Sequence, residues 1–256
     1  VGAKVDSRGG WTVLFDDADS EHFDRVAVTT GGMPKTGDFL MLRQLGHDVE
    51  QPVASLFTFH INDPELSALM GTVVSPVLAS IPGTKMRSEG PLLITHWGMS
   101  GPAILKLSSY AARYLQECNY QSAVAVNWLG ELHRDTVWQQ LQQLVSMHPQ
   151  KQLLSVRPFG LPSRLWQYLL QKTSLAEDRR WAELGTKSMN RLAETLTNDT
   201  YRINGKGTFR DEFVTCGGVS LRDVNYNTLE SKQCGGLYFA GEVLDIDAIT
   251  GGFNLQ

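Results

Sequence analysis

The chain has 256 residues, which is enough for one large domain or for two to three small ones. Its 42% hydrophobic and 20% charged residues are typical of a soluble globular protein, and no apolar run reaches the roughly 18 residues that a membrane helix needs. Its net charge of −4, without any run of lysine or arginine, argues against a nucleic-acid-binding surface, and the expected substrate is a small molecule.

The three cysteines are far apart in the sequence and odd in number: Cys118, Cys216 and Cys234. Because this spacing fits neither a metal site nor a disulfide framework, the sequence predicts no metal ion and a reducing, cytoplasmic location. The chain starts at Val1 without a signal segment and stops at Gln256, so we expect a fragment of a longer protein.

Residues 1–51 are predicted to form mainly strands. The runs "AKV", "WTVLF" and "DRVAVTTGG" contain the β-branched and aromatic residues of strands, with turns expected at "SRGG" and "DDADSEHF". A helix is expected near "TGDFLMLRQLGH", with Gly46 directly after its last turn.

From Pro52 the strands become short and are broken by glycine and proline. The runs "SLFTFHI", "TVVSPVLASI", "GPLLITH" and "SAVAVNWL" predict a small barrel or sandwich. One helix interrupts them, with Ser100 as its expected cap and Pro102 in its first turn. Its apolar positions recur at helical spacing: Ile104, Leu107, Ala111 and Tyr114 or Leu115.

Residues 135–199 are predicted to form a bundle of four short helices. Asp135 and Thr186 are expected helix caps, and the capping-box pattern at 174–177 predicts a short helix of its own. The expected inward residues are Val137, Leu141, Leu144 and Val145, then Leu165, Trp166, Leu169 and Leu170, then Met189, Leu192, Ala193 and Leu196.

Strands return after Tyr201, so one strand-rich module is interrupted by another. This order indicates an insertion, which is tolerated where the entry and exit points lie close together. We therefore expect residues 1–51 and 214–256 to form one domain, 52–134 and 200–213 a β-barrel insert, and 135–199 a helical insert.

The final segment, "GLYFAGEVLDIDAITGGFNLQ", carries the strongest functional signal. A buried strand ends at Ala240, Gly241 allows close approach of a ligand, and Glu242 places an acceptor at the carboxyl end of the strand, where open α/β sheets bind ligands. The next residues predict a helix start whose free N–H groups suit an electron-rich oxygen: Thr250, Gly251, Gly252, Phe253 and Asn254. A strand–turn–helix connection whose glycines serve only the turn explains the same pattern.

Thr30, Gly31 and Gly32 end the run "VAVTTGG", which by itself indicates a tight turn after a parallel strand. The run "VTCGGVSL" has the same texture and the same interpretation.

Other patterns assign no catalytic residue. "HRD" lacks the further residues of a kinase loop, and "GMSGP" has proline in place of the last glycine of G-x-S-x-G. His96 as a catalytic acid, and Asp245 with Asp247 as a carboxylate pair, stay open beside the ordinary alternatives of a buried histidine and an acidic surface loop.

Three blocks together resemble the HI0933-like flavoproteins, bacterial FAD-dependent enzymes often labelled NAD(FAD)-utilising dehydrogenases or aminoacetone-oxidase-like proteins. They are "VAVTTGGMPKTG", "GPLLITHWGMSGPAILKLS" and the segment from "TFRDEFVTCGG" to the end, and they occur in the family's order. The resemblance implies an α/β fold with inserts, in which a Rossmann-like FAD domain is interrupted by a small β-barrel and a small helical domain.

The resemblance also implies where FAD is held. Gly31 and Gly32 match a block near its dinucleotide part, in which Thr29 replaces the usual alanine. Gly241 and Glu242 match residues that face the ribityl–pyrophosphate region, and residues 251–254 match the helix start that approaches the flavin ring.

This sequence departs from the family pattern in two ways. Ala248 stands where family members usually carry glycine, and no G-x-G-x-x-G fingerprint for the pyrophosphate is present. We therefore expect an incomplete FAD domain that binds FAD in a longer protein, while the chain by itself is inactive and without FAD.

The resulting hypothesis is a fragment of a cytoplasmic FAD-dependent oxidoreductase of unknown substrate, in which the flavin supplies the electron chemistry. The alternative is a non-catalytic binding module derived from a flavoprotein.

Overall fold

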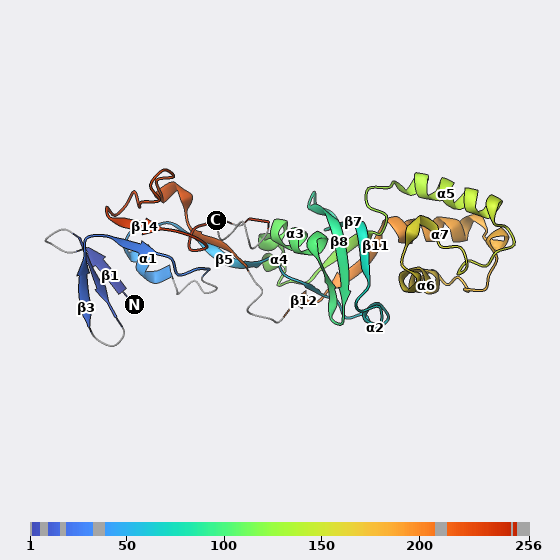
Figure 1. The fold of residues 1–256 in the computed structure, drawn as a ribbon, viewed down its shortest axis with the longest axis horizontal. Coiled ribbons are helices and arrows are strands. Elements are labelled where there is room, and N and C mark those ends of the chain that lie inside the picture. Colours follow the sequence, from blue (N-terminus) through green and yellow to red (C-terminus); the bar gives the residue numbers. More distant parts are fainter. Residues whose placement is uncertain are drawn as a thin grey trace. The chain divides into compact units, whose positions relative to one another are not determined.

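The structure is a computed structural model that describes residues 2–5 (backbone only), 10–15, 19–32, 39–207, 214–246 and 248–249 (Figure 1). The chain divides into two compact units, Val1–Leu56 with Arg210–Gln256 (unit 1) and Phe57–Phe209 (unit 2). The finer division into three domains stays a prediction.

Unit 1 is built from short strands that form one three-stranded sheet and two strand pairs. The antiparallel sheet consists of β1 (Gly2–Val5), β2 (Trp11–Leu14) and β3 (Ser20–Phe23); β4 (Val26–Val28) pairs in parallel with β14 (Leu237–Phe239), and β5 (Val49–Ser55) pairs antiparallel with β13 (Val214–Val219). Strand β3 corrects the expected turn at "DDADSEHF". All four of its side chains are exposed, so it lacks the alternation of apolar and polar residues that marks a strand.

The core of unit 1 surrounds Trp11, which is fully buried. Its indole N–H donates to the carbonyl of Gly235 at 3.1 Å, just before β14, and so joins the first sheet to the last strand. Helix α1 (Leu40–Gln44) adds Leu42 to this core, and Gly46 follows it at φ +91°, as predicted for a glycine after the helix end.

His47 is buried beside β14 and holds the turn that precedes it. Its Nδ1 lies 3.0 Å from the carbonyl of Leu42, and its Nε2 lies 2.8 Å from the hydroxyl of Ser231. That hydroxyl already accepts the N–H groups of Gln233 and Cys234, so its own proton points to Nε2, and the imidazole proton is assigned to Nδ1. The fully used hydrogen bonds indicate a structural role.

Unit 2 contains a seven-stranded sheet in the order β11–β10–β7–β8–β9–β6–β12. Its strands are β6 (Phe59–His60), β7 (Val73–Ser80), β8 (Arg87–Thr95), β9 (Gly98–Ser100), β10 (Ser122–Asn127), β11 (Asp199–Ile203) and β12 (Gly205–Lys206). The two edge strands, β11 and β12, are separated in sequence only by Asn204. This one extended segment pairs with β10 through β11 and with β6 through β12. It therefore closes the sheet into a barrel.

Helices α3 (Pro102–Tyr110) and α4 (Ala112–Glu117) cover the barrel with the predicted apolar face, since Ile104, Leu107, Ala111 and Leu115 are fully buried. The expected cap at Ser100 is wrong. Ser100 lies in β9 and its hydroxyl accepts from Thr58 at 2.8 Å, while Gly101 is the N-cap at φ +89°. A Cβ at Gly101 would lie 2.9 Å from the Pro91 carbonyl, so only glycine fits there.

Helices α5 (Arg134–Met147), α6 (Ser163–Lys172) and α7 (Thr186–Thr197) gather at one end of unit 2 (Figure 1), and the short α2 (Pro64–Ser67) lies under β8. The predicted faces of α6 and α7 are buried in full, and α5 buries Val137 and Leu141. A fourth helix at 174–177 is wrong, because Ser174 turns at φ +59° and the following residues form an isolated bridge between Arg180 and Gln152. Two single turns of 3₁₀ helix complete this part, Pro158–Gly160 and Trp181–Glu183.

Asp199 is a buried charge at the junction of barrel and helices. Its carboxylate accepts hydrogen bonds from Trp128 Nε1 at 3.0 Å and from the Tyr201 hydroxyl, and pairs with Lys172 of α6 at 2.6 Å. Its side chain is 3% exposed, so these partners offset the cost of burying the charge.

Candidate functional site

The candidate site lies at the carboxyl ends of β4 and β14. These neighbours are parallel, with Leu237 opposite Val26 and Phe239 opposite Val28, so both strands end at the same edge. The Ala240 N–H continues the pairing by donating to Val28 at 3.2 Å. Thr30, Gly31 and Gly32 therefore follow one strand while Gly241 and Glu242 follow its neighbour, which is where parallel sheets bind ligands.

Gly32 is the point at which three segments converge. A Cβ atom on Gly32 would lie 2.6 Å from Thr215 Oγ1 and 2.8 Å from Glu242 Oε2, both closer than real Cβ atoms approach. Gly32 lies in the loop after β4, Glu242 follows β14, and Thr215 belongs to β13. The missing side chain lets a hydroxyl and a carboxylate share the space next to the Gly32 backbone.

Two further glycines leave the edge open. Gly31 and Gly241 have φ of +73° and +80°, values that residues with a side chain rarely adopt. A Cβ atom on either would have no neighbouring atom within 4 Å. The Gly241 carbonyl accepts the N–H of Leu244 at 3.1 Å and closes a turn that holds Glu242 half-buried. Backbone is thus exposed on both sides of the Glu242 carboxylate, where a bulky ligand has room.

The glycines of β13 have a packing role. Gly217 and Gly218 have φ of +106° and +145°, and a Cβ on Gly218 would lie 2.5 Å from the Val243 carbonyl. Val219 then donates to Val243 and accepts from Asp245, each at 2.9 Å. Close backbone packing places Thr215 and the turn at Glu242 against each other, consistent with the structural interpretation of "VTCGGVSL".

The donors and acceptors of this edge suit a ligand that carries hydroxyl groups. The Glu242 carboxylate accepts hydrogen bonds, the Thr215 hydroxyl both donates and accepts, and sugar hydroxyls pair with both. Thr215 is buried, with 8% of its surface exposed, which fixes its orientation. It is the site residue that the sequence analysis missed. The signal was the second threonine–glycine run, in "VTCGGVSL", but its position beside Gly32 depends on strand pairing.

Part of the predicted site lies outside the described residues, namely Thr250, Gly251, Gly252, Phe253, Asn254 and also Asp247. Among the residues that the structure does describe, no three metal-binding side chains gather. His96 is exposed at the β8–β9 hairpin, where its ring centroid lies 3.5 Å from that of Trp97 with the ring planes tilted by 55°, and no substrate contact follows from that position.

A family model described as the HI0933-like protein barrel and H2TH domain matches residues 53–214. The chain belongs to the HI0933-like family. This match covers the barrel and the helices of unit 2 and confirms the resemblance seen in the sequence. It supports a mixed α/β fold with a barrel-and-H2TH domain, while the Rossmann-like arrangement of unit 1 belongs to the proposals.

The curated relatives carry enzyme names. The chain is 31% identical over 242 residues to a ribosomal RNA dihydrouridine synthase of Escherichia coli and 30% identical over 239 residues to one of Haemophilus influenzae. It is 26% identical over 249 residues to a 3-dehydro-bile acid delta(4,6)-reductase of Clostridium scindens. These alignments cover 91%, 90% and 93% of this chain but 57%, 56% and 61% of the relatives, so the chain spans a little over half of their length.

Within the described residues, none of the helices has the length and apolar character required to span a membrane. Cys118, Cys216 and Cys234, all within the described residues, form no disulfide bond.

Proposed function

We propose that this chain is part of an FAD-dependent oxidoreductase that adds two hydrogens across a carbon–carbon double bond. The observation that carries the proposal is the convergence of Gly32, Thr215 and Glu242 at the carboxyl edge of the β4–β14 pair, beside the open positions at Gly31 and Gly241. This edge has the space and hydrogen-bonding groups for the sugar chain of a flavin dinucleotide. FAD bound there and first reduced by an external two-electron donor would supply the hydride, and a proton from the solvent would complete the addition.

The protein's own residues would bind and orient the cofactor. Glu242 would accept hydrogen bonds from sugar-chain hydroxyls, which are strong because the acceptor is charged. Thr215 would present its hydroxyl from the rigid strand β13, and Gly31 and Gly241 would let the cofactor approach their backbone. Unit 1 thereby acts as an incomplete Rossmann-like cradle in this proposal.

The reaction type is inferred from two unlike substrates. Dihydrouridine is uridine with two hydrogens added across a ring double bond, and a delta(4,6)-reductase by its name removes carbon–carbon double bonds. A reduction of this kind is the step that the names have in common. A non-catalytic binding module is not favoured, because all three named relatives are enzymes.

Of the two substrate classes, we propose a uridine in structured RNA. The two relatives named for ribosomal RNA are 31% and 30% identical, against 26% for the bile-acid enzyme. This differs from the expectation of a small-molecule substrate without nucleic acid, which rested on the net charge of the whole chain. Three cysteines that form no disulfide bond are compatible with a cytoplasmic location, where such RNA is found.

The test uses the full-length protein. Purified protein should contain FAD, identified by chromatography of the released cofactor. RNA from cells that lack the gene should lose dihydrouridine at a defined position, seen in mass spectrometry as a missing mass of two hydrogens, and the wild-type gene should restore it. Protein purified without flavin would overturn the assignment of FAD as the cofactor. Unchanged dihydrouridine in the RNA would overturn the assignment of RNA as the substrate.

A further inference from the structure

Charge is unevenly distributed along the chain. From the start of α5 to the end of α7, residues 134–197 contain nine lysines and arginines against five aspartates and glutamates, whereas the whole chain contains 23 against 27. This helical part is therefore positive by four, although the whole chain is negative by four. The net charge of the whole chain, from which we expected no basic patch, averages over a positive helical part and a negative remainder.

The helical part also contains a long stretch without carboxylates. Residues 136–176 have no Asp or Glu, in a chain where these make up 27 of 256 residues. The stretch spans α5 from its third residue, the connection to α6 and the whole of α6. The carboxylates that follow this stretch lie on the connection to α7, at Glu177, Asp178 and Glu183, and the Glu183 carboxylate accepts the Arg180 backbone N–H at 3.3 Å.

Basic side chains meet where this stretch pairs with the connection to α7. Gln152 is bridged to Arg180, the Leu153 N–H donates to the Arg179 carbonyl at 2.8 Å, and the Trp181 N–H donates to Lys151 at 3.0 Å. This pairing places Lys151, Arg179 and Arg180 side by side on two neighbouring segments.

None of these three cations is neutralised by a carboxylate within the described part of the chain. Arg180 donates to the Gln150 amide at 3.0 Å and Arg179 to the Glu183 backbone carbonyl at 2.8 Å. The ion pairs in this part are instead formed by Arg134 with Glu194 and by Lys172 with Asp199, away from this pairing. Lys151 and Arg180 are exposed, so their charge is available to a partner.

Next to these cations lies a hollow of about 420 Å³, lined by His148, Ser155 and Arg157 among others. Arg157 is exposed and, in the described residues, forms no ion pair. His148, Lys151, Arg157, Arg179 and Arg180 together are called the basic end. Arg157 lines the hollow with His148, whose carbonyl accepts the Lys151 N–H at 3.0 Å, and the four lysines and arginines of the basic end suit an anion with more than one charge.

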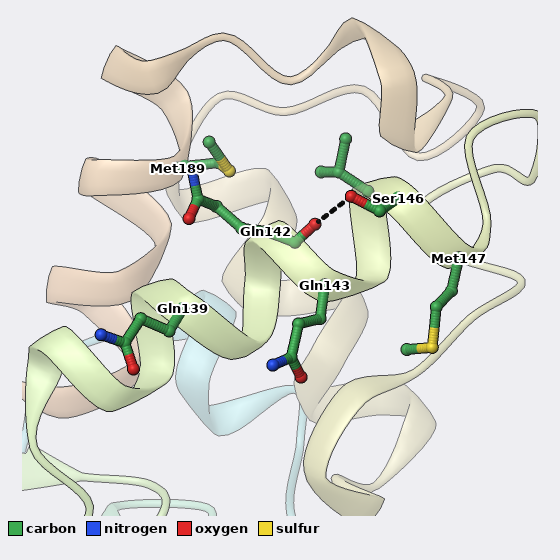
Figure 2. Close-up of a pocket in the computed structure, with 7 residues that line it drawn as sticks. Gln139, Gln142, Gln143, Ser146, Met147 and Met189 are labelled. Carbon is green, nitrogen blue, oxygen red and sulfur yellow. Dashed lines mark hydrogen bonds between the residues drawn. The ribbon is translucent and has the colours of Figure 1, made fainter.

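The basic end continues into a neutral polar groove along α5. Gln139, Gln142, Gln143, Ser146, Met147 and Met189 line a groove of about 660 Å³ (Figure 2). The Ser146 hydroxyl donates to the Gln142 backbone carbonyl at 3.1 Å, which leaves the three glutamine amides as the exposed polar groups. Each amide provides donors and an acceptor, which can pair with phosphate oxygens and ribose hydroxyls.

We infer that the basic end and the glutamine groove of α5 form the surface on which the substrate RNA docks through its phosphate backbone. The inference rests on the proposed function for the choice of RNA, and on the charges and contacts of the helical part for its location. Contacts to phosphates position a nucleic acid without reading its sequence. This surface would hold the RNA while the choice of the uridine is made elsewhere.

The experiment compares two double variants of the full-length protein. Lys151→Gln/Arg157→Gln removes two cations of the basic end. Lys85→Gln/Arg87→Gln removes two cations of the barrel that are also exposed, at and beside the start of β8, and is the matched control. Binding to a fluorescently labelled hairpin of ribosomal RNA is measured by anisotropy over a series of salt concentrations, with circular dichroism as the folding check.

The basic-end variant should bind roughly tenfold more weakly, and the slope of log K against log salt should fall by about 0.7–0.9 for each phosphate that the variant no longer neutralises. The control should retain wild-type affinity and slope. An unchanged slope in the basic-end variant, or an equal weakening in the control, would overturn the docking surface. Wild-type protein that binds anionic lipid vesicles or an acidic peptide as tightly as the RNA hairpin would also overturn it.

Flavin content measured on the same samples separates the two proposals. Protein that binds RNA through the basic end but contains no flavin would overturn the proposed redox function and leave the docking surface. Flavin-containing protein whose RNA binding ignores the basic end would overturn the docking surface and leave the redox function.

Discussion

Gly32 lies so close to Glu242 that a Cβ atom at residue 32 would stand 2.8 Å from the carboxylate oxygen Oε2. The two residues are 210 positions apart in the numbering of the sequence, and the parallel pairing of β4 with β14 brings them together. Residue 32 is glycine because a side chain would not fit there, whereas residue 31 is glycine because its φ is positive.

Replacing Gly32 by alanine should therefore overpack the site. The new methyl group would meet Thr215, which is buried and branched at Cβ and so has little freedom to move. We expect a decrease of about 1–3 kcal/mol in the free energy of unfolding, measured with urea, and a loss of flavin from the full-length protein. Gly235→Ala is the control, because a Cβ there meets nothing within 4 Å.

A second change tests which neighbour is responsible. Adding Thr215→Ala to Gly32→Ala removes the hydroxyl that lies closest to the new methyl group and should recover part of the stability. If the two effects simply add, Thr215 is not the obstacle.

Glu242→Gln should weaken FAD binding in the full-length protein. The amide keeps the size of the side chain but loses the negative charge, and a charge-assisted hydrogen bond contributes about 1.5–3 kcal/mol, so affinity should fall roughly tenfold or more. Titration of the apoprotein with FAD measures this, and Glu21→Gln, an exposed residue of β3, is the control. Wild-type affinity in the Glu242 variant would remove this residue from the site.

Asp199→Ala should be strongly destabilising. The change leaves the Trp128 N–H, the Tyr201 hydroxyl and the Lys172 ammonium without their common acceptor in a buried place. We expect a cost of about 3–5 kcal/mol in chemical unfolding. Arg134→Ala is the contrasting variant: it breaks the pair with Glu194, whose two side chains are 44% and 51% exposed, and should cost about 0.2–1 kcal/mol. Equal costs would contradict the role of burial.

Stability should fall at alkaline pH because of two tyrosines near Asp199. Burial raises the pKa of Tyr201 well above its ordinary value of 10.0, and the nearby Asp199 charge raises it further. Burial also raises the pKa of Tyr168. The folded state keeps both protons where the unfolded state has lost them, so their contribution is complete below pH 10 and declines as pH rises above it. Urea midpoints measured across that range should decline less in Tyr168→Phe than in the wild type.

The Asp223 carboxyl should make stability depend on pH in the opposite direction. Burial acts to raise the pKa of its carboxyl, but hydrogen bonds from the Gln233 amide at 2.9 Å and the Asp48 N–H at 2.7 Å outweigh this and leave the pKa lowered. The carboxylate therefore stabilises unit 1 at neutral pH, and this contribution is lost as pH falls below the ordinary aspartate range. Asp223→Asn should be less stable than wild type at neutral pH, with the difference shrinking in acid.

Three sequence blocks in a fixed order were enough to predict the family, and local patterns predicted those elements whose signal lies within one turn or one strand. The buried faces of α6 and α7 follow from apolar spacing alone, as do Pro102 in the first turn of α3 and Gly46 after α1. Gly31, Gly32, Gly241 and Glu242 follow the ends of β4 and β14 as the strand pattern predicts, while their role as cofactor-binding residues stays a prediction.

Features that depend on residues far apart in the chain could not be predicted from local patterns. The cap at Ser100 failed because Gly101 packs against Pro91 and Leu93, and β3 was missed because its exposed residues pair with β2 without an apolar face. Closure of the barrel depends on β11 and β12 reaching opposite sheet edges, and Thr215 joins Gly32 and Glu242 only after three strands have paired. The spacing of apolar residues predicts which face of a helix or strand is buried. Which element packs against that face depends on packing energies summed over the whole fold.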